Sequence, residues 1–180
     1  PTHSYMKALY KYPQAKFPYG WLVDEGRRRS REEPPPKILD SGVFDDNRYF
    51  DVQAEYAKSG PNDVLARITI ANRGPDDAEL WVLPTAWFRN TWIWGCRHEG
   101  CTLKPLMTRS GPASVAAEHE TLGRFHIAFG PASDGSAGEL LFTENETNTK
   151  KLYDTDQYTP YVKDAFHRYV VDGETEAVHP

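Results

Sequence analysis

Apolar and polar residues alternate along residues 49–57, in the sequence YFDVQAEYA. This period of two is typical of a half-buried strand, with an inward set of Phe50, Val52, Ala54 and Tyr56. Residues 64–72, VLARITIAN, repeat the pattern with an inward set of Val64, Ala66, Ile68 and Ile70. The segments SGPND and NRGPDD that follow the two runs contain the residues that turns require. The pattern therefore predicts an antiparallel meander.

Residues 80–94 break this alternation, because large apolar groups fall on both faces of LWVLPTAWFRNTWIW. We expect a strand that is buried on two sides, with an edge position or a bulge at Pro84, which cannot donate to a ladder. Many short strands with regular turn signals are typical of a β-sandwich. Further strands are expected at residues 102–107, 113–120, 123–129 and 139–143, with a flexible hairpin loop at 130–138.

Both ends of the chain depart from the strand pattern. Residues 1–36 are interpreted as an irregular lead-in that contains a short helix entered at Pro18. In residues 159–173, TPYVKDAFHRYVVDG, Thr159 is the expected N-cap and Gly173 the expected stop of one amphipathic helix. We therefore predict a single, mainly β domain over residues 1–180, an antiparallel β-sandwich with a short N-terminal helical segment and one C-terminal helix.

Charge and length limit the partners that this chain can have. The formal net charge of -5 argues against a nucleic-acid partner, because phosphate neutralisation needs a concentrated positive field. No apolar stretch approaches the roughly 20 residues that cross a bilayer, so we expect no membrane contact. The chain begins at Pro1 and ends at Pro180 without a terminal helix or tail, and we expect it to be a piece of a longer protein.

Motifs that carry catalysis or bind metals are weak in this sequence. Cys96 and Cys101 flank the segment RHEG, but their spacing fits no standard zinc finger, so we favour a free thiol pair or a loop disulfide and predict no metal site. No phosphate loop, serine nucleophile elbow or Cys/His dyad is visible, and no cofactor or catalytic residue is predicted. Solvated turns or strand faces best explain the carboxylate pairs Asp45/Asp46, Glu118/Glu120 and Asp154/Asp156.

Two segments carry the candidate binding residues. In residues 87–95, WFRNTWIWG, core packing by Trp87 and Phe88 is one interpretation. The other is a sugar site, in which tryptophan rings offer a face to a pyranose and polar neighbours bind its hydroxyls. Residues 142–153, FTENETNTKKLY, contain a glycosylation sequon, or else a loop that hydrogen-bonds a sugar or an adjoining domain. The candidate contact residues are Arg89, Asn90, Trp92, Trp94, Glu144 and Asn145.

Several blocks of the sequence, most specifically GVFDDNRYFDV, WFRNTW and FTENETN, resemble the N-terminal region of large bacterial proteins similar to glycoside hydrolase family 63. That group includes the mannosyl-oligosaccharide glucosidases. The resemblance implies a supersandwich-like, many-stranded β-sandwich that precedes an α/α barrel. It also implies that the catalytic carboxylates lie on the barrel and that the reaction inverts the sugar carbon. The segment CRHEGC departs from the family pattern, so we expect that loop to be particular to this protein.

The resemblance thus implies a non-catalytic N-terminal domain of an α-glucosidase-like hydrolase, inactive by itself. Its partners would be the catalytic α/α barrel and an oligosaccharide. Trp87 and Phe88 would then serve the core, and the candidate contact residues would face the barrel or its substrate. Without the barrel, an exposed apolar patch would offer a surface for a homodimer. Two alternatives stay open, namely a stand-alone carbohydrate-binding module and a protein-interaction sandwich.

Overall fold

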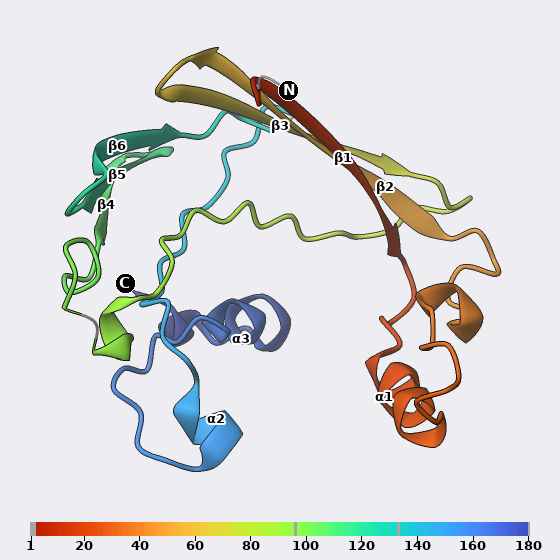
Figure 1. Ribbon diagram of the computed structural model, residues 1–180. Coiled ribbons are helices and arrows are strands. Elements are labelled where there is room, and N and C mark those ends of the chain that lie inside the picture. Colours follow the sequence, from red (N-terminus) through yellow and green to blue (C-terminus); the bar gives the residue numbers. More distant parts are fainter. Residues whose placement is uncertain (1–2, 96, 133, 180) are drawn as a thin grey trace. The chain divides into compact units, whose positions relative to one another are not determined.

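The computed structural model describes residues 3–95, 97–132 and 134–179. Where the sequence suggests one domain, the chain divides into two compact units, Pro1–Leu80 and Trp81–Pro180. The described residues form two three-stranded antiparallel sheets and three α-helices (Figure 1). The mainly β, antiparallel class, with a short helix after the first strand and a helix near the C-terminus, is confirmed. The face-to-face packing of a sandwich stays a prediction.

Strand β2 lies between β1 and β3 in the N-terminal unit (Figure 1). The bounds are Tyr5–Pro13 for β1, Tyr49–Gly60 for β2 and Asp63–Asn72 for β3. The predicted meander is confirmed, because β2 and β3 pair antiparallel with Ala54 opposite Ile68. Paired residues point to the same face of a sheet, so the two predicted apolar sets share one face.

Strand β1 corrects the expectation of an irregular lead-in over residues 1–36. It pairs with β2 along its whole length, from Tyr5 opposite Ala57 to Pro13 opposite Tyr49. In YMKALYKYP one face is apolar, but Tyr5 and Leu9 interrupt the polar face, so the period-two alternation is imperfect. Pairing with a long neighbour therefore decides its structure more than its own pattern does. The short helix entered at Pro18 is confirmed as α1, Tyr19–Arg28.

The second face of this sheet carries cross-strand ion pairs. Asp51 accepts hydrogen bonds from Lys11 at 2.9 Å and from Arg73 at 2.7 Å. Four residues further along β2, Glu55 accepts from the Tyr5 hydroxyl at 2.6 Å and from Arg67 Nη2 at 2.8 Å. These two hydrogen bonds, the Tyr5 bond first, lower the pKa of Glu55 to about 2. The pairs link all three strands and favour this register.

The C-terminal unit contains the second sheet, in the order β4-β5-β6 (Figure 1). Its strands are Leu106–Gly111, Ser114–His119 and Gly123–Ala128. The last two lie within predicted strands, whereas β4 begins four residues later than expected. Val115 and Ala117 of the central strand are 5% and 1% exposed, so the central strand buries the side chains of one of its faces.

The strands predicted at residues 80–94 and 139–143 are wrong. Neither segment joins a ladder; both run as extended chain, and a short 3-10 helix, Trp92–Trp94, ends the first. The expected core position of Trp87 is also wrong, since this side chain is 63% exposed. Two-sided apolar character predicts two-sided burial only where neighbouring layers exist, and no strand in the described residues pairs with this segment. Phe88 is half-buried, with its ring 5.0 Å from that of His119.

The C-terminal helix forms, but it begins later than the sequence predicts. Helix α3 is Ala165–Asp172, and Gly173 ends it as predicted, with a φ of 71°. Thr159 does not cap this helix, because its hydroxyl accepts from the Tyr161 N–H in a local turn. A short helix that the sequence did not predict, α2, spans Thr149–Tyr153. The core of this region is formed by Val162, Ala165, Ala177 and Val178, against which Leu141, Phe166 and Tyr169 pack.

Candidate functional site

Hydrogen bonds join seven residues from four segments of the C-terminal unit into one polar group, which we call the Glu146 cluster. Four of the six candidate contact residues belong to it, so the structure brings together two segments that the sequence separates by about fifty residues. The members of the Glu146 cluster are Asn90, Trp92, Lys104, Glu144, Asn145, Glu146 and His179.

Backbone hydrogen bonds hold residues 142–146 in place without a regular ladder. The Glu144 N–H donates to Tyr161 O at 2.8 Å, and Glu146 O accepts from the Lys163 N–H at 2.9 Å. The His179 N–H donates to Phe142 O at 3.0 Å. The segment is therefore bonded to residues 161–163 and to the C-terminal residues, which fixes the direction of both glutamates.

Two asparagines connect this segment to the end of the aromatic stretch. Asn145 Nδ2 donates to Phe88 O at 2.8 Å, and Asn90 Nδ2 donates to Asn145 O at 3.0 Å. Asn145 has a φ of 54°, a left-handed conformation that asparagine tolerates better than most residues. Asn145 is half-buried and its amide nitrogen is bonded to the backbone, so its side chain takes part in holding the two segments together.

Glu146 lies at the centre of the cluster and is 8% exposed. The indole N–H of Trp92 donates to Glu146 Oε1 at 2.8 Å, and Asn90 Nδ2 lies 3.4 Å from Oε2. Lys104 Nζ is 3.4 Å from Oε1 and supplies a positive charge. A buried carboxylate is stable only with donors of this kind, so these contacts account for its position.

Glu144 is the second carboxylate of the cluster, and both Lys104 and His179 Nε2 bond to it. Burial alone would raise the pKa of Glu144, but the hydrogen bonds from Lys104 and His179 outweigh burial and hold the pKa below its ordinary value. The imidazole of His179 also stacks on the ring of Tyr161, with 4.0 Å between centroids. The C-terminal end of the chain is thereby attached to the cluster.

These contacts use most of the polar groups that a sugar would need. The Trp92 N–H, both amide nitrogens and both carboxylates bond to other members or to the backbone. Asn90 Oδ1 has no partner in the described chain, but it is buried away from any ligand. The arrangement is thus suited to bracing the unit rather than to binding a hydroxylated ligand at its centre.

The two remaining candidate contact residues lie outside this arrangement as described. Arg89 is exposed, and the side chain of Trp94 lies outside the described part of the structure.

Three members of the Glu146 cluster were not predicted from the sequence. Glu146 carried a signal, since it is the middle residue of the sequon and directly follows the candidates Glu144 and Asn145. Lys104 and His179 belong to no motif and reach the cluster through long-range folding.

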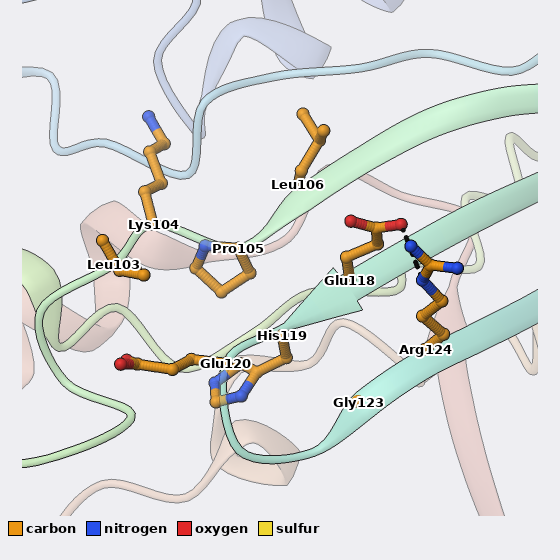
Figure 2. Close-up of a pocket in the computed structure, with 9 residues that line it drawn as sticks. All are labelled: Leu103, Lys104, Pro105, Leu106, Glu118, His119, Glu120, Gly123 and Arg124. Carbon is orange, nitrogen blue, oxygen red and sulfur yellow. Dashed lines mark ion pairs between the residues drawn. The ribbon is translucent and has the colours of Figure 1, made fainter.

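A hollow of about 360 Å³ lies beside the cluster, between the start of β4 and the turn from β5 to β6 (Figure 2). Glu118 and Arg124 form an ion pair at 3.1 Å along its rim. His119 Nδ1 accepts from the Thr121 N–H at 3.2 Å, and Figure 2 shows that the amino group of Lys104 points away from His119 and Glu120. The charged groups of this hollow do not converge on a common point.

The other predictions about chemistry concern metals, thiols and membranes. Among the residues that the structure describes, no group of three or more His, Cys, Asp or Glu side chains could hold a metal ion. The predicted thiol pair or disulfide involves Cys96, which lies outside the described residues. Within the described ranges, no helix has both the length and the apolar character that crossing a bilayer requires.

Comparison with known proteins places the chain beside one part of a much longer protein. It is 39% identical, over 210 aligned residues, to the uncharacterized protein YMR196W of Saccharomyces cerevisiae. The match covers 100% of the chain and 19% of the yeast protein, so the chain spans about a fifth of the length of the curated relative it matches. No family model matches the chain, and no solved structure does.

Proposed function

We propose that this chain is a non-catalytic domain of a larger, α-glucosidase-like hydrolase related to glycoside hydrolase family 63. In that protein it would pack against the catalytic α/α barrel and help to shape the active site. The proposal draws its carbohydrate chemistry from the sequence resemblance. Its role as a docking domain rests on residues 81–93, which we call the aromatic segment.

The aromatic segment presents large apolar side chains to solvent and is the observation that carries the proposal. Trp81 is 60% exposed, Trp87 is 63% exposed and Ile93 is 56% exposed. Exposed apolar side chains that gather in one segment mark candidate sites of interaction, and tryptophan is enriched among the residues that dominate interface energetics. A surface that binds another polypeptide explains why these side chains avoid the core of the unit.

The Glu146 cluster supports the same interpretation. Phe88 O, Asn90 and Trp92 of the aromatic segment are bonded to residues 145 and 146, so the cluster fixes the end of a segment that has no ladder of its own. Holding an apolar segment in one conformation lowers the entropy cost of binding it. Bracing of this kind favours a pre-formed docking surface over a flexible linker.

A carbohydrate-binding module is the second candidate, because exposed tryptophan rings can stack on sugars. Calorimetric titration of the 180-residue chain with short α-glucosides separates the two functions. We expect no saturable binding at millimolar sugar, since the polar groups near the rings are already bonded. Saturable binding that Trp87→Ala abolishes and Trp21→Ala preserves would replace the docking proposal with the module.

The docking proposal itself is tested on the full translated product of the reading frame that contains this chain. We expect the full product to hydrolyse α-glucosides and the 180-residue chain to be inactive. The fluorescence of Trp87 is obtained as the difference between each protein and its Trp87→Phe variant. Acrylamide should quench this fluorescence strongly in the 180-residue chain and much less in the full product. A full product that is inactive on α-glucosides, or a Trp87 that is equally accessible in both proteins, would refute the corresponding half of the proposal.

A further inference from the structure

The N-terminal sheet has one face that is almost wholly apolar. The strand register places the apolar residues of this face side by side across the three strands. Tyr10, Val52 and Ile70 form one row, and Ala8, Ala54 and Ile68 form the next. Besides the tyrosine hydroxyls, Lys58 and Asn72, near strand ends, bring polar groups to this face. The apolar face consists of Met6, Ala8, Tyr10, Tyr12, Phe50, Val52, Ala54, Tyr56, Val64, Ala66, Ile68 and Ile70.

Most of the large side chains on the apolar face are exposed. Met6, Tyr10 and Val64 are 57%, 53% and 55% exposed, and Ile68 near the centre is 39% exposed. Phe50 is the exception, at 4%. The opposite face holds the Asp51 and Glu55 ion pairs, which are compatible with water. A sheet with one apolar and one charged face must bury the apolar face against another layer.

The total exposed area of the chain is large for its mass. The chain exposes 13842 Å², whereas a folded monomer of its mass, 20.5 kDa, exposes about 8,800 Å². Even two separate globular domains of half this mass would together expose only about 10,700 Å². The excess is therefore about 3,000 Å² over both units together, and the apolar face is one of the surfaces that contribute to it.

We propose that the apolar face of β1-β2-β3 is covered by an uncharged, apolar layer from outside residues 1–180 of the same longer polypeptide. The proposal rests on the proposed function only in requiring a longer protein, for which the 19% coverage of the yeast relative is the independent support. The match leaves about four fifths of the yeast relative outside it, which is ample chain for such a layer. A second copy of this chain is the other occupant that the test distinguishes.

Thiol labelling of two neighbouring positions on β3 tests this proposal. Ile68 points to the apolar face and Thr69 to the charged face, and both are exposed in this structure. Ile68→Cys and Thr69→Cys are compared in the full translated product, with Cys96 and Cys101 replaced by serine. We expect the thiol at position 68 to react at least about 100-fold more slowly than that at 69. In the 180-residue chain the two rates should agree within about threefold.

Ala54→Cys, opposite Ile68 on β2, provides a second reporter on the apolar face should Ile68→Cys fail to fold. Equal reactivity of positions 68 and 69 in the full product would overturn the proposal, as would a reading frame that stops at Pro180. Protection of position 68 in the 180-residue chain would overturn it as well. In that case ultracentrifugation shows whether the chain is a dimer or a 20.5 kDa monomer whose own residues cover the apolar face. Absence of α-glucosidase activity in the full translated product would refute the proposed function and leave the labelling result unaffected.

Discussion

Glu146 is the residue on which the candidate site depends. It is buried, it accepts the Trp92 indole N–H at 2.8 Å, and Lys104 lies near it. The neighbouring Glu144 binds Lys104 and His179 in turn. Because one lysine serves both carboxylates, removal of either glutamate changes the surroundings of the other.

Glu146→Ala should lower the free energy of unfolding of the C-terminal unit by roughly 2–4 kcal/mol, because it leaves the Trp92 indole N–H without its acceptor. Glu118→Ala is the matched control: its side chain is 54% exposed and pairs only with exposed Arg124, so we expect less than about 0.5 kcal/mol. Urea unfolding followed by tryptophan fluorescence measures both. Equal effects of the two variants would contradict a central role for Glu146.

Part of this site could be predicted from single residues. The sequence pointed to Asn90, Trp92, Glu144 and Asn145 because tryptophan, amide and carboxylate groups gathered in two short segments. What it could not show is that these groups bond to one another. That outcome depends on the long-range approach of residues 88–92 and 144–146, which no local spacing encodes. Lys104 and His179 were missed for the same reason.

At the scale of elements, the N-terminal sheet depends on its charged face. Hydrogen bonds from Tyr5 and Arg67 hold the pKa of Glu55 at about 2, against an ordinary value of 4.5. A carboxylate with a lowered pKa stabilises the fold fully above the ordinary value and loses this contribution as the pH falls toward the folded pKa. The sheet should therefore weaken as the pH falls from about 4.5 to about 2.

Carboxyl-carbon NMR titration of Glu55 tests this expectation. Tyr5→Phe should raise the pKa of Glu55, because the tyrosine hydroxyl is the largest cause of the shift. Tyr12→Phe, on the same strand but the opposite face, should leave the titration midpoint in place. An unchanged midpoint in Tyr5→Phe would show that the bond does not form in solution.

Gly173 makes a testable contribution at the end of α3. Its φ is 71°, and a Cβ added there would meet no atom within 4 Å, so the cost of a side chain is conformational and not steric crowding. Gly173→Ala should destabilise the C-terminal unit by about 1 kcal/mol. Gly173→Asn should cost less, since asparagine tolerates this conformation. Thermal unfolding of the two variants should give the lower midpoint for alanine, and the reverse order would contradict this origin.

Elements were predictable from the sequence where one face alone is apolar. Period-two alternation located β2 and β3, turn signals between short runs located β5 and β6, and Pro18 and Gly173 located the start of α1 and the end of α3. The same reasoning missed β1, whose faces both carry large side chains. It also predicted a strand at residues 80–94, where the structure has none. In the second case a run that is apolar on both faces was taken as buried, although Trp81 and Trp87 are exposed. The sequence pattern shows which residues are apolar, but it does not show which other segment covers them.

For the whole molecule, the excess exposed area predicts an unusual response to denaturant. The urea m-value scales with the surface exposed on unfolding. From the 13842 Å² that the folded chain exposes, unfolding should expose about three quarters of the area that a typical monomer of this mass exposes. Equilibrium urea unfolding of the 180-residue chain, summed over both units, should therefore give an m-value about three quarters of that of size-matched monomers.

An m-value at the size-matched level would mean that the chain buries its apolar face and its aromatic segment without help, and both docking surfaces would lose their basis. The opposite result is a reduced m-value for the 180-residue chain together with an ordinary m-value per residue for the full translated product. It would show that these surfaces become buried only in the longer protein. Since m reports buried area and not activity, the outcome is independent of which sugar the parent enzyme hydrolyses. It therefore tests the architecture of the molecule separately from its chemistry.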